Sequence, residues 1–171
     1  MMTEKLQAAF NNQVNEELFS AYLYASMSCY FELQNLKGFA HWMQIQTQEE
    51  MAHAAKFINF LLDRGVQVKL REIAAPDSSW ASPLAAFEAA YKHECHISEC
   101  MNKLSSLAVD EKDHASRIFL EWFVTEQVEE EANADNMVQQ LKRVADAPAG
   151  LFMLDREASQ RPAPTAATTA P

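Results

Sequence analysis

Two pairs of polar residues lie the same distance apart in the two halves of the chain. Glu17 precedes Glu50 by 33 residues, and Glu94 precedes Gln127 by the same 33. Glu50 opens a Glu-x-x-His motif that ends at His53, and Gln127 opens a Gln-x-x-Glu motif. A glutamate on one helix followed by Glu-x-x-His on the next, repeated once, is how a four-helix bundle builds a site for two metal ions. The spacing therefore predicts a carboxylate metal site.

The residue types of this site indicate which cations it would hold. Residues three apart on a helix share a face, which places His53 beside Glu50 and Glu130 beside Gln127. Buried carboxylates without a counter-charge are costly, and cations remove that cost. Oxygen ligands with one imidazole suit iron or manganese and also hold zinc. The sequence thus predicts a site with four glutamates and one histidine, namely Glu17, Glu50, Glu94, Glu130 and His53.

A second group of acidic residues accompanies the first. Glu49 adjoins Glu50, and Glu126, Glu129 and Glu130 share an arc of about 100° on one helix. These side chains predict a third cation site on the inner side of the bundle. The alternative is that this run of acids is a solvated helix face.

Three further side chains lie near the predicted ligands. Tyr24 follows Glu17 by seven residues, two helical turns along the same stripe, so it is either a redox-active or hydrogen-bonding neighbour of the metals or a core tyrosine. His93 and His96 flank Glu94 at angles that keep all three from pointing inward together. We therefore expect both histidines to lie outside the ligand set.

The composition predicts long helices that position these residues. The chain has three glycines, and no proline occurs from 1 to 75. Gly38 marks a turn, Gly65 follows a helix end, and Ser82-Pro83 begins a helix. Pro148 to Gly150 ends the fourth helix before a short amphipathic segment. The predicted helices span 3 to the mid-thirties, 39–64, 83 to about 109, about 114–146 and 151–159.

The connector from 66 to 82 predicts the topology. Glu50 and Glu94 each lie 11 residues past a helix start, so they are level only if those two helices run parallel. Seventeen extended residues reach about 55 Å, more than the length of the preceding helix, about 39 Å. We expect an all-α four-helix bundle with one long crossover and a short fifth helix. It forms one domain over 1–159, followed by a disordered Pro/Ala/Thr-rich tail over 160–171.

Charge and composition exclude several classes of function. The net charge of −10 argues against binding to nucleic acid or to anionic membranes, which require basic patches. No apolar run reaches the roughly 20 residues of a transmembrane helix. The N-terminal residues lack the apolar region of a secretory signal, so we expect a cytoplasmic protein. Three cysteines without Cys-x-x-Cys spacing indicate free thiols.

Over about residues 3 to 158 the sequence resembles the bacterial non-haem ferritins. The resemblance rests on a specific set of residues: Glu17, Tyr24, Glu49-Glu50-x-x-His53, Tyr91-Lys92-His93-Glu94, Trp122 and Glu126-Gln127-x-x-Glu130.

The resemblance implies a ferroxidase that stores iron. Fe(II) would be oxidised by dioxygen or hydrogen peroxide at a di-iron centre and stored as a ferric mineral inside a hollow twenty-four-subunit shell. Gln127 would lie close to the second iron. The implied ligands are Glu17, Glu50 and His53 for the first iron, Glu50, Glu94 and Glu130 for the second, and Glu49, Glu126, Glu129 and Glu130 for the third.

Other functions carry distinct sequence signals. A bacterioferritin has Glu-x-x-His in both halves, whereas this chain has Gln127 and Glu130 there. Met51 stands where bacterioferritins carry a haem-ligating methionine, but we expect it to point away from the core and no haem to bind. A small di-iron oxidase or peroxide-detoxifying enzyme is a further alternative. A helical scaffold would replace Glu17, Glu50 or Glu94 with apolar residues, and this chain keeps all three.

Overall fold

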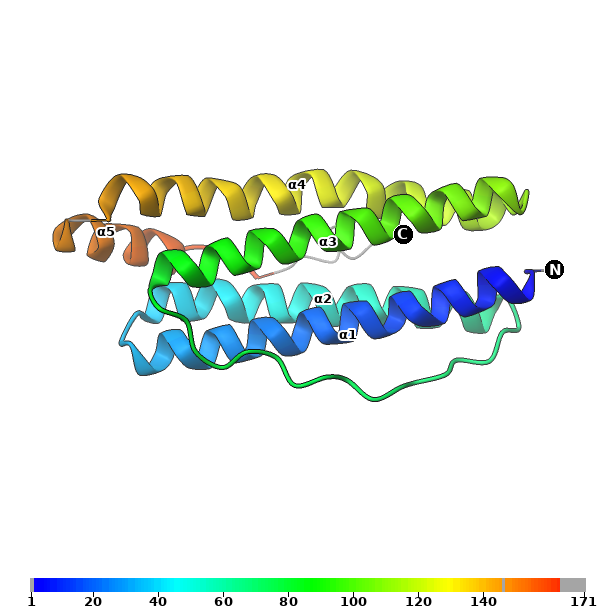
Figure 1. The fold of residues 1–171 in the computed structure, drawn as a ribbon, viewed down its shortest axis with the longest axis horizontal. Coiled ribbons are helices and arrows are strands. Elements are labelled where there is room, and N and C mark those ends of the chain that lie inside the picture. The colour runs from blue at the N-terminus through cyan, green and yellow to red at the C-terminus, as the bar shows by residue number, and fades with distance from the viewer. Residues whose placement is uncertain (1, 146, 164–171) are drawn as a thin grey trace.

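The computed structural model describes residues 2–145 and 147–163. Within them the chain forms helices and connecting turns without a strand, as predicted. Four long helices lie side by side, and a short fifth helix packs at one end (Figure 1). None of the described helices combines the length and apolar character needed to cross a membrane. The helices are α1 (Glu4–Leu33), α2 (Lys37–Asp63), α3 (Pro83–Asp110), α4 (His114–Val144) and α5 (Pro148–Ala158).

The predicted long crossover is confirmed. α2 and α3 run in the same direction, and the connector returns along α1 for the length of the bundle (Figure 1). Asn11 of α1 fixes one end of it, because its Oδ1 accepts a hydrogen bond from the Lys69 N–H at 2.6 Å and its Nδ2 donates to the Gln67 carbonyl at 3.2 Å. Near the other end, Ser26 Oγ donates to the Asp77 carbonyl at 2.7 Å. These bonds satisfy polar groups of a segment that has no regular structure of its own.

The helix termini follow local sequence signals. The side chains of Thr3, Ser82 and Asp113 each accept a hydrogen bond from a backbone N–H in the first turn of the helix that follows. Gly65 has a φ of 68° just after α2, the left-handed conformation that favours glycine at a helix end. Pro83 occupies the first position of α3, where its missing N–H costs nothing.

The expectation that Gly38 marks a turn is wrong. α2 begins at Lys37, and Asn35 adopts the left-handed conformation in the turn, with a φ of 59°. A Cβ atom on Gly38 would lie 1.6 Å from the carbonyl oxygen of Asp155 in α5. Asp155 also accepts a hydrogen bond from the Phe39 N–H at 2.9 Å through its Oδ1. Glycine is therefore needed here because α5 packs directly on the first turn of α2.

The fifth helix starts earlier than predicted. Residues 148–150 form the first turn of α5 rather than a break before it, since proline is well tolerated at the first helical position. α4 ends at Val144, and the predicted end near Asp146 lies outside the described residues. Leu154 and Ala158 bury the inner side of α5.

Two apolar clusters fill the bundle on either side of its middle. Phe31, Phe39 and Phe87 pack together toward the α5 end, with ring centroids 5.3 to 5.5 Å apart. Phe10 and Phe57 belong to the cluster at the other end. Burial of each such side chain stabilises the fold by about 1.5–3 kcal/mol. The predicted site residues come from the helical segments between these clusters, so apolar packing on both sides fixes their position.

Candidate metal centre

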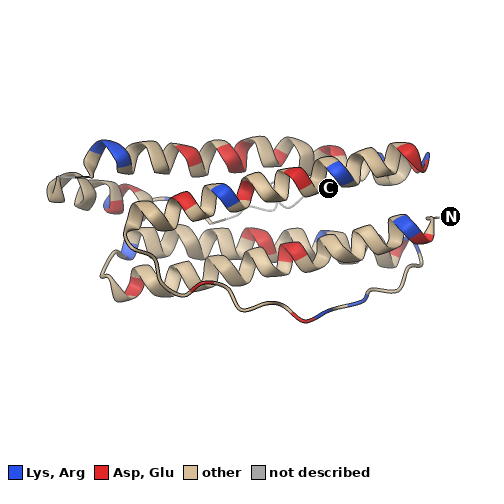
Figure 2. Cartoon of the chain, in the orientation of Figure 1, with Lys and Arg blue, Asp and Glu red and all other residues tan. Residues whose placement is uncertain are grey.

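The four long helices bring the predicted ligands of the two-metal centre together in the core, whereas Glu129 of the predicted third site is exposed. Acidic positions recur near the middle of each helix (Figure 2). α1 contributes Glu17, α2 contributes Glu50 and His53, and α3 contributes Glu94; α4 contributes Gln127 and Glu130. Each of these six residues is at most 5% exposed. A group of buried polar side chains of this size requires partners, because burial without them is costly.

The first half of the centre consists of Glu17, Glu50 and His53. His53 Nδ1 lies 3.8 Å from Glu17 Oε2 and 3.4 Å from Glu50 Oε2. One potential ligand atom from each residue lies within 4.8 Å of the other two. Glu17 Oε2 is buried without a hydrogen-bond partner among the described residues. Two carboxylates, one imidazole and an oxygen that lacks a partner fit a divalent transition metal.

The second half is built around Glu94. The Tyr24 hydroxyl donates a short hydrogen bond to Glu94 Oε1. Gln127 Nε2 donates to Glu94 Oε2 at 3.2 Å. Tyr24 is fully buried. It is therefore both a hydrogen-bonding neighbour of the site and a core residue, the two roles that the sequence left open. Gln127 lies beside the site with its amide nitrogen toward Glu94, and a glutamine side chain binds a metal only through its carbonyl oxygen.

Two glutamines that belong to neither predicted motif also contact the carboxylates. Gln13 Nε2 donates to Glu17 Oε1 at 2.8 Å. Gln46 Nε2 donates to Glu130 Oε2 at 2.7 Å and lies 3.4 Å from Glu50 Oε1. Both glutamines lie four residues before a predicted ligand on the same helix. The i, i+4 spacing is the only sequence signal that could have identified them.

Burial makes these carboxyls weak acids. Burial first, and then the charge of Glu50, raises the pKa of Glu17 to about 8. Burial and the nearby Glu130 likewise raise the pKa of Glu94 to about 8. Burial also raises the pKa of Glu50 well above its ordinary value. Carboxyls of this kind hold protons at neutral pH until a cation replaces them.

Arg161, which follows α5, forms an ion pair with one residue of the predicted third site. Arg161 Nη2 donates to Glu49 Oε2 at 2.6 Å. The arginine Cζ lies 4.3 Å from the ring centroid of Trp42, and the arginine carbonyl contacts His41 Nε2 at 2.9 Å. Arg161 falls within the tail expected to be disordered, of which residues 164–171 lie outside the described residues. No sequence pattern predicts this contact, because a surface arginine has many possible partners.

A second cation, Lys56, lies near Glu126, another residue of the predicted third site. Lys56 Nζ lies 3.1 Å from the ring centroid of Trp122. Burial lowers the pKa of Lys56 to about 8, and the carboxylate of Glu126 opposes this shift. Burial raises the pKa of Glu126 itself. Glu49 and Glu126 thus each have a basic side chain nearby, so an arriving cation would compete with both.

Trp122 and His93 lie beside the centre, whereas Met51 does not. The Trp122 ring packs edge-on against His53, with centroids 5.5 Å apart. His93 Nε2 lies 2.7 Å from Ser20 Oγ, and burial lowers the pKa of His93 to about 4, which keeps the imidazole neutral. Met51 is 51% exposed, so it points away from the core as predicted.

Comparison with known proteins agrees with this geometry. The ferritin-like domain model matches residues 7–144. The chain is 45% identical over 161 residues to a bacterial non-haem ferritin of Bacteroides fragilis, covering 94% of this chain and 100% of the relative. It is 34% identical to the bacterial non-haem ferritin of Staphylococcus aureus strain MRSA252, covering 94% of this chain and 97% of the relative.

Solved structures give the same result. An open-pore ferritin from the hyperthermophilic archaeon Archaeoglobus fulgidus superimposes with a TM-score of 0.94 at 46% identity, covering 95% of this chain and 100% of the archaeal chain. A humanized archaeal ferritin superimposes with a TM-score of 0.95 at 45% identity, covering 96% of this chain and 100% of the other. A domain match, relatives aligned over nearly their full length and the same bundle with its short fifth helix together place this chain in the ferritin family.

Proposed function

We propose that this protein stores iron and that its buried centre is a ferroxidase site. The observation that carries the proposal is the first half of the centre, where Glu17, Glu50 and His53 present ligand atoms within 4.8 Å of one another. Glu17 Oε2 there has no hydrogen-bond partner among the described residues. The ferritin relatives support the same function. Fe(II) is the substrate, and the oxidised iron is the cargo.

Glu50 has the central role in the proposed mechanism. One of its oxygens lies 3.4 Å from His53 Nδ1, and the other lies 3.4 Å from Gln46 Nε2, which also bonds Glu130. Its two oxygens therefore face the two halves of the centre. A carboxylate in this position holds two Fe(II) ions close together. The closeness allows both ions to reduce one oxidant molecule.

The electrons and protons balance with either oxidant. Two Fe(II) give up two electrons, which with two protons reduce dioxygen to hydrogen peroxide, or reduce hydrogen peroxide to two waters. Glu17 and Glu94 have pKa values of about 8, so they release protons when iron binds. Those protons become available at the site where the oxidant is reduced.

The product requires storage in an assembly. We propose that the chain forms a hollow homo-oligomeric shell, with twenty-four subunits as the resemblance to ferritins implies, and that ferric iron collects inside it. Glu49, Glu126 and Glu129 with Glu130 are the proposed third site, through which iron passes from the centre. In that role an incoming cation displaces Arg161 from Glu49.

Aerobic loading with excess Fe(II), followed by size exclusion, tests storage. Iron and protein are quantified in the same fractions. We expect far more iron per chain than three sites hold, eluting together with a large assembly. About two iron ions per chain on a small oligomer would instead indicate a di-iron oxidase or a peroxide-detoxifying enzyme.

Two substitutions test the catalytic centre. Glu94→Ala and His53→Ala should each slow Fe(II) oxidation at least tenfold, since each removes a metal ligand. The matched controls are Glu72→Ala and His114→Ala, which change exposed residues of the same types. Helix content by circular dichroism should not change in any of the four. Oxidation at the wild-type rate in both ligand variants would contradict the assignment.

A further inference from the structure

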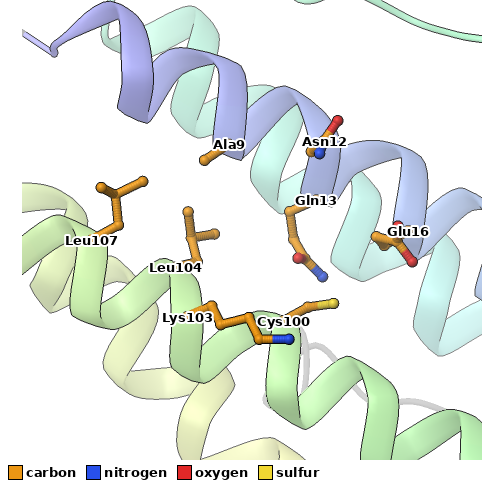
Figure 3. A pocket seen from close by; sticks show the side chains of 8 residues that line it. All are labelled: Ala9, Asn12, Gln13, Glu16, Cys100, Lys103, Leu104 and Leu107. Carbon is orange, nitrogen blue, oxygen red and sulfur yellow. The ribbon is translucent and has the colours of Figure 1, made fainter.

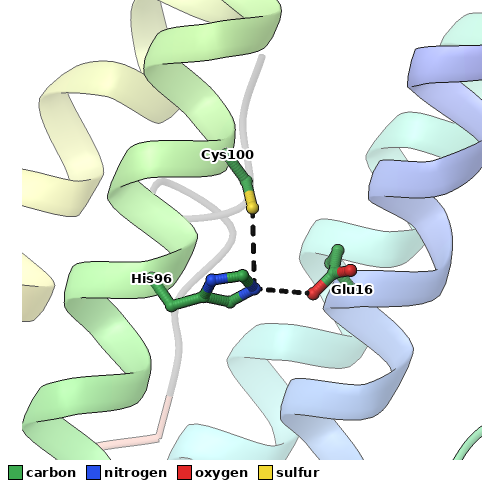
Figure 4. A group of neighbouring side chains, drawn as sticks. All are labelled: Glu16, His96 and Cys100. Atoms are coloured by element: carbon green, nitrogen blue, oxygen red, sulfur yellow. Dashed lines mark hydrogen bonds and ion pairs between the residues drawn. The ribbon is translucent and has the colours of Figure 1, made fainter.

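A second group of potential metal ligands lies outside the buried centre. Glu16 of α1 faces His96 and Cys100 of α3 (Figure 4). His96 Nε2 lies 3.1 Å from Glu16 Oε2, and Cys100 Sγ lies 3.6 Å from the same nitrogen. The carboxylate, imidazole and thiol therefore converge on one point between two helices. None of the three residues belongs to the predicted ligand set of the buried centre.

Two of the three distances between ligand atoms are close to those of a tetrahedral metal site, and the third is at most 4.8 Å. With bonds of about 2.0–2.2 Å to nitrogen and oxygen and about 2.3 Å to sulfur, tetrahedral ligands lie about 3.4 Å apart for nitrogen and oxygen and about 3.6 Å apart for nitrogen and sulfur. The side chains show 3.1 Å and 3.6 Å for these pairs. A metal ion therefore fits with only small movements of the side chains.

An ion pair alone does not account for the group. The side chains of His96 and Glu16 are 52% and 35% exposed, and an exposed pair of this kind contributes little to stability. Such a pair needs no thiol beside it. Cys100 follows His96 by four residues, the i, i+4 spacing that places both side chains on one helix face. The thiol thus completes a set of three different ligand types.

The surroundings connect this group with the buried centre. A cavity of about 200 Å³ between α1 and α3 has Glu16, Cys100 and Gln13 in its lining (Figure 3). Gln13 is 3% exposed and donates a hydrogen bond to Glu17 Oε1 at 2.8 Å. One glutamine therefore separates the surface group from a predicted iron ligand. The cavity lies on the α1–α3 side, whereas the proposed third site belongs to α2 and α4.

We propose that Glu16, His96 and Cys100 bind one divalent transition-metal ion of borderline softness, such as Zn(II) or Fe(II). Oε2, Nε2 and Sγ supply three ligands, and the exposure of His96 leaves the fourth position to water. The thiol proton passes to solvent when the metal binds. The inference does not rest on the proposed function, because the buried centre has no sulfur ligand.

Binding of Co(II) under anaerobic, reducing conditions tests this site. Cobalt bound to a thiolate gives an intense near-ultraviolet charge-transfer absorption that carboxylate and imidazole ligands do not produce. Wild-type protein should show this absorption with the intensity of one cobalt-thiolate bond per chain, in addition to Co(II) that binds the buried centre without it. Cys100→Ser should abolish it, and His96→Ala should weaken binding by roughly tenfold or more. Cys29→Ser, which changes an exposed free cysteine, should keep the full absorption.

The outcomes separate this site from the buried centre. Glu17→Ala weakens Co(II) binding at the centre but should leave the charge-transfer absorption intact. Absence of the absorption in wild-type protein with bound Co(II) would overturn the inference, as would its persistence in Cys100→Ser. A failed iron-loading experiment with an intact absorption would refute the proposed function and leave this site in place.

Discussion

Glu17 and Glu94 are buried carboxyls that hold protons in the absence of a cation. Their pKa values of about 8 compare with an ordinary value of 4.5. Between pH 4.5 and about pH 8 the folded chain therefore binds more protons than the unfolded chain. The free energy of unfolding must therefore fall as pH rises across that range, by up to about 1.4 kcal/mol per pH unit for each carboxyl.

This pH dependence is testable on metal-free protein. Urea unfolding between about pH 5 and about pH 8 should show stability decreasing with pH. Saturating Zn(II) should remove most of the slope, because the cation takes the place of the protons. Glu94→Gln removes one titrating group and should reduce the slope. An unchanged slope in Glu94→Gln would show that Glu94 is ionised in the folded state.

At the scale of helices, the contact between α5 and α2 depends on a single glycine. Replacing glycine by alanine inside a helix normally stabilises it by about 1 kcal/mol. In Gly38→Ala the new Cβ would lie 1.6 Å from the Asp155 carbonyl oxygen, so α5 must move away. We expect a lower melting temperature and faster proteolysis between α4 and α5. A higher melting temperature would contradict the close packing.

The segment after α5 bears on the proposed third site. Arg161→Ala removes the guanidinium that bonds Glu49 at 2.6 Å and frees a carboxylate for a cation. We expect a third divalent ion to bind severalfold more tightly, measured by calorimetry with Zn(II) after the buried centre is filled. Arg156→Ala, at an exposed position of α5, is the matched control. Equal third-ion affinity in wild type and Arg161→Ala would exclude competition by the arginine.

At the scale of the whole molecule, exposed apolar side chains indicate surfaces that assembly covers. Met153 and Phe152 of α5 are 70% and 62% exposed, and Leu70 of the connector is 68% exposed. Adjacent large apolar side chains at a surface, such as Phe152 and Met153, are characteristic of interaction surfaces. Within a shell these positions would be buried by neighbouring copies of the chain.

Met153→Asp tests the assembly. A charge at a buried interface is costly, so the variant should elute from size exclusion as smaller species while its helix content stays unchanged. Gln160→Asp adds the same charge at an exposed polar position and should assemble normally. Assembly of both variants to wild-type size would show that α5 lies outside the subunit interface.

Much of the fold follows from local properties of the sequence. Helix caps at Ser82 and Asp113, the glycine after α2 and the apolar stripes depend only on neighbouring residues. The positions of Glu50 and Glu94, each 11 residues past a helix start, made the parallel crossover predictable, because only that topology brings the two glutamates to one level. Helix ends were less predictable, since proline both starts and stops helices, and α5 began at Pro148 instead of after it.

The sequence by itself determined the helical bundle and which buried carboxylates meet His53 at its centre, because both depend on helical periodicity and on spacing along single helices. Only the tertiary structure decided three contacts between distant segments: Gly38 with Asp155, Arg161 with Glu49, and Glu16 with His96. Each joins residues at least 80 positions apart. Such pairs have no repeating pattern, so their distances are fixed only when the helices pack side by side.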